Sequence, residues 1–129
     1  MWLMTKIGFF SIVKKGNEFG KDTWTIRSRS KQDMENLKKF AWLNGEVLTT
    51  PEGDYHYRII INVEELKDIF DKLPESIDYP NFKRMIHANP EQEDKYPFYK
   101  GCWEKLWTYQ FWTERKKSKE GKKFVEEVA

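Results

Sequence analysis

The chain has 129 residues, of which 39% are hydrophobic, 16% aromatic and 34% charged, and its formal net charge is +2. This length is typical of one domain that buries a core without disulfides or metals, and the apolar content excludes an intrinsically disordered chain. The single cysteine, Cys102, excludes an internal disulfide and a thiolate metal cluster within one chain.

The positive charge is concentrated at the carboxyl end. Residues 113–129 hold six Lys or Arg against four Glu, which leaves 17 charges of each sign in residues 1–112. The strongly basic domain typical of DNA-binding proteins is therefore not indicated. We expect one α+β domain over residues 1–112, followed by a basic tail over 113–129 that is disordered or a frayed helix.

Membrane insertion and secretion are not indicated. No apolar run approaches the roughly 20 residues of a membrane span, and the apolar first 13 residues contain Lys6 and lack a cleavage site of small residues. We therefore expect a cytoplasmic protein with no membrane partner.

A β-hairpin is predicted near the amino end. The stretch Gly8–Lys15, entered from residues 1–5, is rich in Phe and β-branched residues and lacks helix caps, which is typical of a buried strand. A loop with two glycines covers residues 16–22, and the next strand covers residues 23–29. Alternation along this second strand places Trp24 and Ile26 on one face and Arg27 and Arg29 on the other.

A helix over about residues 31–42 is predicted to follow. Ser30 and Asp33 have the spacing of a capping box, in which the hydroxyl accepts from a first-turn N–H group and an acid stands three positions later. Met34 and Leu37 begin an apolar face at helical spacing. Asn44-Gly45 is expected to close this helix as a left-handed cap.

The same plan is repeated 32 residues later. A short strand over residues 46–50, a turn and a strong strand over 55–61 are followed by Asn62 and Glu65, which stand where Ser30 and Asp33 stood. We therefore predict two ββα units that form a four-stranded, mostly antiparallel sheet with both helices on one face.

Two helices are predicted at the carboxyl end, a short one over residues 81–87 and a long one from Pro97 to about Thr113. The long helix carries two neighbouring rows of mainly aromatic side chains. Its predicted function is either to pack across the domain or to form an interface with a second copy or another protein. The candidate interface row is Tyr99, Trp103, Trp107 and Phe111.

A candidate ligand site lies on the sheet face away from the two predicted helices. Three guanidinium groups and one imidazole are expected there, and arginine binds phosphate while bases stack on aromatic rings. The alternative is an ordinary solvated face with carboxylates opposite the arginines. Tyr55 shares the helix side by alternation unless the nearby turn exposes it. The candidate residues are Arg27, Arg29, Arg58, His56, Tyr55, Trp2 and Phe10.

Aromatic and basic motifs are spread over the first 106 residues: Met1-Trp2-Leu3-Met4-Thr5, Gly8-Phe9-Phe10-Ser11, Arg27 with Arg29, Asp54-Tyr55-His56-Tyr57-Arg58, Asp78-Tyr79 with Asn81-Phe82-Lys83, and Tyr99 with Trp103 and Leu106. Together they resemble a family of small, uncharacterised bacterial and phage-borne proteins. The resemblance covers roughly residues 1–106 and implies one intact domain without implying an activity. The chain departs from that pattern at His56, where such sequences often have proline, and in its basic tail.

These patterns favour a small non-enzymatic binding protein for a nucleotide or short single-stranded nucleic acid. The alternative is a protein-interaction module, such as a phage-type inhibitor of a host protein, that acts through the aromatic helix. No catalytic motif, metal-ligand spacing or cofactor signature is present, so we expect neither metal nor cofactor. A nuclease would need His56 and His87 to converge.

Overall fold

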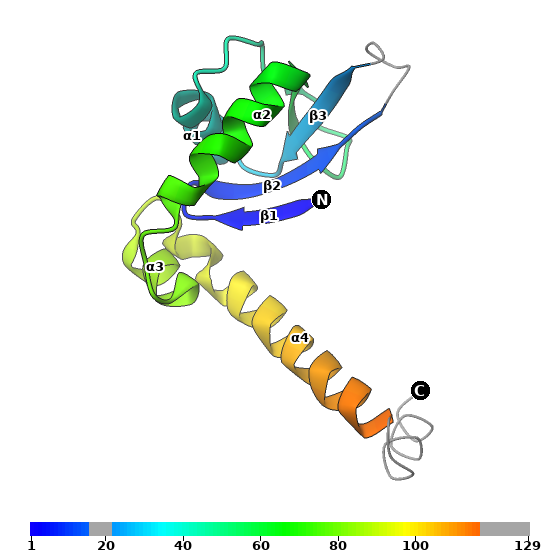
Figure 1. The fold of residues 1–129 in the computed structure, drawn as a ribbon, viewed down its shortest axis with the longest axis vertical. Helices are drawn as coiled ribbons and strands as arrows, with labels where there is room; N and C mark the ends of the chain where they lie inside the picture. The colour runs from blue at the N-terminus through cyan, green and yellow to red at the C-terminus, as the bar shows by residue number, and fades with distance from the viewer. Residues whose placement is uncertain (16–21, 117–129) are drawn as a thin grey trace. The chain divides into compact units, whose positions relative to one another are not determined.

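A five-stranded antiparallel sheet is the centre of the first of two units into which the chain divides, residues 1–85 and 86–129 (Figure 1). The computed structural model describes residues 1–15 and 22–116. The loop predicted over residues 16–22 and the basic tail therefore lie almost entirely outside the described residues. The predicted α+β class is confirmed.

The order of the strands across the sheet is β1-β2-β3-β5-β4. One strand more than predicted is present because the amino-terminal stretch turns back on itself at Lys6 and Ile7 and gives two strands. The Thr5 hydroxyl stabilises this turn, since it accepts from the amide of Gly8 and donates to the Gly8 carbonyl. The strands are β1 (Trp2–Thr5), β2 (Gly8–Val13), β3 (Thr23–Ser28), β4 (Leu48–Thr49) and β5 (Tyr57–Asn62).

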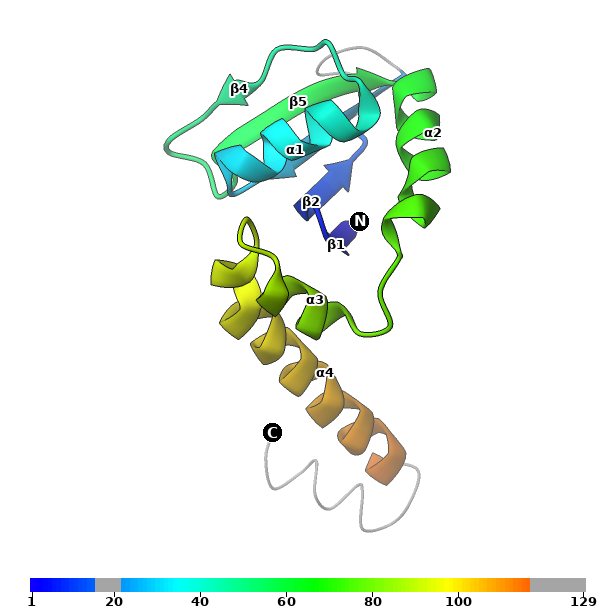
Figure 2. The same ribbon diagram turned by 90° about the vertical axis from the view of Figure 1, so that its left-hand side faces the viewer.

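Helices α1 (Lys31–Ala41) and α2 (Val63–Lys72) both pack on one face of this sheet (Figure 2). The core between them and the strands is made almost entirely of aliphatic side chains. Leu43 also reaches this core, which explains why Trp42 adopts the left-handed conformation that ends α1. The predicted cap at Asn44-Gly45 is therefore wrong by two residues. The buried core consists of Phe10, Ile12, Ile26, Met34, Leu37, Ala41, Leu43, Ile59, Ile61 and Ile69.

Both predicted helix starts are found where expected. Ser30 and Asn62 adopt extended backbone conformations, and their side chains accept from the amides of Asp33 and Glu65. The Glu65 carboxylate also accepts from the Asn62 amide, so the second helix has a complete capping box. The two ββα repeats join through their second strands, because β3 pairs antiparallel with β5 along its whole length.

Asp33 has a different role from the capping role predicted for it. Its carboxylate accepts from the amide of Phe9 at 3.1 Å in β2 and does not complete a capping box with Ser30, whose amide donates to Ser28. Asn36, one turn further along α1, donates to the carbonyl of Ile7. The start of α1 thus fixes the turn between β1 and β2.

The described part of the second unit, residues 86–116, consists mainly of helical segments. A short 3-10 turn, η3 (Glu93–Lys95), leads into α4 (Tyr96–Lys116), which begins one residue before the predicted Pro97. A further 3-10 turn, η2 (Leu73–Ser76), follows α2, and α3 (Phe82–Ala88) spans the division between the units. Within the described ranges, no helix is both long and apolar enough to cross a membrane.

Candidate ligand-binding face of the sheet

One row of directly opposed residues crosses all five strands. Strand register pairs Trp2 with Ser11, Ser11 with Arg27, Arg27 with Arg58, and Arg58 with Leu48. Directly opposed residues in a sheet share a face, and Ile12, Ile26 and Ile59, one position along on the three middle strands, lie in the core beneath α1 and α2. The row therefore lies on the face away from the helices, and we call its five residues, together with Arg29, the arginine face.

Arg27 and Arg58 face each other across β3 and β5, where like charges directly opposite destabilise a sheet. The Arg27 Nη2 atom donates to the Ser11 hydroxyl at 2.7 Å. The Nε atoms of both arginines are buried and have no hydrogen-bond partner among the described residues. Each arginine of this pair therefore has an N–H group that forms no hydrogen bond within the described residues.

Carboxylates do not neutralise this cluster in the part of the chain that the structure describes. None of Arg27, Arg29 and Arg58 forms an ion pair there, whereas Lys6 and Asp78 do so at 2.7 Å elsewhere in the same unit. The predicted alternative, in which carboxylates stand opposite the arginines, is therefore not found in these residues.

Tyr55 lies against the arginines, contrary to strict alternation. The Arg27 and Arg29 guanidinium carbons lie 4.5 and 4.0 Å from the centroid of its ring, and the residue is only 3% exposed. The tight turn before β5 breaks the alternation, because the Thr50 amide donates to the His56 carbonyl and the Gly53 amide to the Thr50 carbonyl. Tyr55 is therefore a buried support for two cations rather than an open stacking surface.

The exposed aromatic ring of this face is Trp2, which is 70% exposed. Phe9 contacts it edge to face, with ring centroids 6.1 Å apart. The prediction that Phe10 belongs to the site is wrong, since Phe10 is 2% exposed and lies in the core. Alternation along β2 places Phe9 and Ser11 on the same face as Arg27 and Phe10 on the opposite one, so Phe9 lies where Phe10 was predicted.

Gly53, like Phe9, is a residue that the sequence prediction of the site missed. A Cβ atom added there would lie 3.5 Å from Nη2 of Arg58 and 3.2 Å from the Tyr55 carbonyl oxygen. The guanidinium of Arg58 thus reaches toward the turn before β5. The only sequence signal for this contact was the turn glycine itself, which indicates close approach without naming the neighbour.

The histidines do not form a catalytic pair within either unit. The His56 ring contacts that of Tyr57, which packs against the core, and within the described residues no hydrogen bond, ion pair or ring contact joins His56 to the arginines. His87 belongs to the second unit and its ring lies 4.6 Å from that of Tyr96. Over the described ranges, no group of three His, Cys, Asp or Glu side chains is arranged to hold a metal ion.

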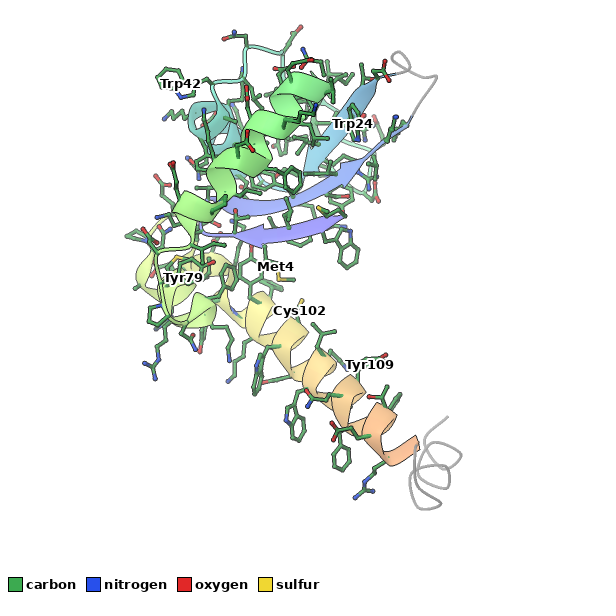
Figure 3. The ribbon with its side chains drawn as sticks, in the orientation of Figure 1. Met4, Trp24, Trp42, Tyr79, Cys102 and Tyr109 are labelled. Atoms are coloured by element: carbon green, nitrogen blue, oxygen red, sulfur yellow. The ribbon has the colours of Figure 1, made fainter. Side chains whose placement is uncertain are left out.

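The predicted interface row on α4 is mostly exposed. Trp103, Trp107 and Phe111 are 51%, 59% and 40% exposed, whereas Tyr99 is buried. Side chains such as that of Tyr109 project from the carboxyl half of this helix (Figure 3). Within the second unit these three rings are therefore not covered, and the packing of α4 across the domain stays a prediction.

Comparisons with protein-family models, curated proteins and solved structures found no match to this chain. The candidate site therefore depends on the geometry described above.

Proposed function

We propose that the protein is a non-enzymatic binder of a nucleotide or a short single-stranded nucleic acid on its arginine face. The observation that supports this best is the direct opposition of Arg27 and Arg58, with Arg29 beside them and no ion pair to a described carboxylate. A fold gains nothing in stability from such a pair alone. A phosphate group would remove the repulsion and accept hydrogen bonds from the guanidinium groups.

The spacing of the face fits both parts of a nucleotide. Neighbouring strands lie about 4.8 Å apart, so Trp2 on β1 and Arg27 on β3 are separated by roughly 10 Å. A base stacked on the exposed Trp2 ring would place its phosphates over Arg27 and Arg58. Base stacking on an aromatic ring tolerates any base, so the proposal implies weak sequence preference.

The contacts of Tyr55 change which arginine is the best test. Removing Arg27 or Arg29 would also uncover the Tyr55 ring, and a loss of binding would be confounded by a loss of stability. Arg58→Gln avoids this contact and removes one charge. Arg84→Gln is the matched control, since Arg84 is an exposed arginine on α3.

The experiment is a fluorescence anisotropy titration of a labelled single-stranded oligonucleotide, repeated at several salt concentrations. If three phosphates are contacted, log K should fall with log salt at a slope of about −2. Arg58→Gln should weaken binding roughly tenfold, which corresponds to one charge-assisted contact, while Arg84→Gln leaves it unchanged. An equal loss of oligonucleotide affinity in both variants, or no oligonucleotide binding at low salt, would contradict the proposal.

A second candidate function is supported by the exposure of Trp103 and Trp107 on α4. Exposed tryptophans are typical anchors of protein interfaces, so the protein would act as an interaction module, for example as a phage-type inhibitor of a host protein. Replacing both tryptophans with alanine should then abolish that complex without changing oligonucleotide affinity. Loss of oligonucleotide binding in this variant would instead tie α4 to the first function.

A further inference from the structure

The exposed face of α4 has a pattern that is symmetric about Trp107. Lys100, Trp103, Trp107, Phe111 and Glu114 follow one another at spacings of three, four, four and three residues. At 3.6 residues per turn all five fall within an arc of roughly 80° on one side of the helix. The outer two residues carry opposite charges, and the inner three are aromatic.

We infer that this face pairs with the same face of a second copy, with the two α4 helices antiparallel and the two-fold axis at Trp107. In that arrangement Lys100 opposes Glu114 of the partner subunit, and Trp103 opposes Phe111 of the partner subunit. A two-fold axis repeats each contact, so both ends of the pair gain an ion pair. A parallel pair would instead place each charge against its own kind.

The surface of α4 already has a hollow that would receive a side chain of the second helix. Trp107, Gln110, Phe111 and Glu114 line a shallow hollow. Their positions i, i+3, i+4 and i+7 are those of the four residues that receive one side chain of a facing helix in knobs-into-holes packing. The antiparallel register about Trp107 brings Trp103 of the partner subunit over this hollow.

The walls of the hollow are held in place before pairing. The rings of Trp107 and Phe111 are stacked, with centroids 6.0 Å apart and planes 10° apart. The guanidinium of Arg115 lies 4.4 Å from the centroid of Phe111 on the same helix. Side chains that are already ordered lose less conformational entropy on association, which favours binding.

The area is that of a weak dimer. With about 200 Å² for a full aromatic side chain, the exposed fractions of Trp103, Trp107 and Phe111 amount to roughly 300 Å² per chain. For both chains these rings amount to roughly 600 Å², which is below the roughly 1,200 Å² of standard specific interfaces and indicates a weak dimer. We therefore expect a dissociation constant in the micromolar range.

The test is sedimentation velocity of the full chain over roughly 1 to 300 µM, a range that brackets a micromolar equilibrium. Lys100→Glu and Glu114→Lys are each expected to weaken dimerisation about tenfold, because each places like charges opposite one another. An equimolar mixture of the two variants should recover a heterodimer of wild-type affinity, since every opposed pair is then of opposite sign. Lys105→Glu, a charge reversal outside the arc, is the matched control and should dimerise like the wild type.

Each outcome decides the inference. A chain that stays monomeric over this range would overturn it and leave a partner of different sequence as the occupant of α4. A mixture that dimerises no better than its components would exclude the antiparallel register. Far-UV circular dichroism of each variant shows whether α4 still forms. Oligonucleotide binding on the arginine face is measured independently, so failure of either proposal leaves the other standing.

Discussion

Among the described glycines, Gly8 has the closest neighbour, the side chain of Asp33, and Gly8→Ala tests this contact. Gly8 has φ +157°, and a Cβ atom added there would lie 2.5 Å from the carboxyl carbon of Asp33 and 2.6 Å from its Cβ. Asp33 is 1% exposed and accepts from the Phe9 amide. The Asp33 side chain must therefore shift when a methyl group is added to Gly8.

Two costs add up in Gly8→Ala. Loss of a hydrogen bond to a charged group costs about 1.5 to 3 kcal/mol, and a residue other than glycine in this backbone region adds about 1 to 3 kcal/mol. The expected decrease in the free energy of unfolding is therefore about 3 to 5 kcal/mol. For a domain of this size, the melting temperature should fall by at least about 10 °C.

Urea unfolding of Gly8→Ala, Asp33→Ala and the double variant measures the coupling between the two sites. The double variant should be about 2 kcal/mol more stable than the sum of the single effects predicts, because without the carboxyl group only the backbone cost remains. Additivity within about 0.5 kcal/mol would refute the steric argument. Gly101→Ala is the control: a Cβ atom there meets nothing within 4 Å, and the change should be neutral or stabilise α4.

Three further predictions concern single side chains. Asn62→Ala removes the capping box of α2 and should cost about 1 kcal/mol in urea unfolding, and an unchanged midpoint would contradict the cap. Tyr55→Ala should cost about 3 to 5 kcal/mol, whereas Tyr55→Phe should leave stability nearly unchanged because it keeps the ring between the guanidiniums. The hydrogen bond from Lys6 lowers the pKa of Asp78, so Lys6→Gln should raise that pKa toward 3.8 in a carboxyl NMR titration. Since the folded pKa is the lower one, the ion pair stabilises the fold above the unfolded pKa and its effect disappears as the pH falls through the folded value.

The elements with local signals were predictable from the sequence. Ser30 and Asn62 mark helix starts because a capping side chain bonds to an amide only three residues away. The two ββα repeats follow from the same local signals at a constant offset. Helix ends were harder to predict from the sequence. The left-handed residue that ends α1 is Trp42 because Leu43 is buried in the core, and that contact is with residues distant in sequence.

The candidate site was predicted only in part because its details depend on contacts distant in sequence. Alternation correctly placed Arg27 and Arg58 on one face, and strand register brings them opposite each other. The phase of β2 could not be read from two adjacent phenylalanines, so Phe10 was assigned to the site in place of Phe9. Tyr55 was placed on the helix side because the turn that reverses its direction has no signature in the residue alternation.

The junction between the two repeats determines the order in which this unit can be completed. Residues 23–28 pair with β2 along one edge, and their other edge stays unpaired until residues 57–62 are available to cover it. During synthesis the first half therefore exposes an unpaired strand edge until β5 has been made. Such an edge is a template for pairing with other chains. A fragment that stops after α1 should for this reason aggregate rather than behave as a small independent domain.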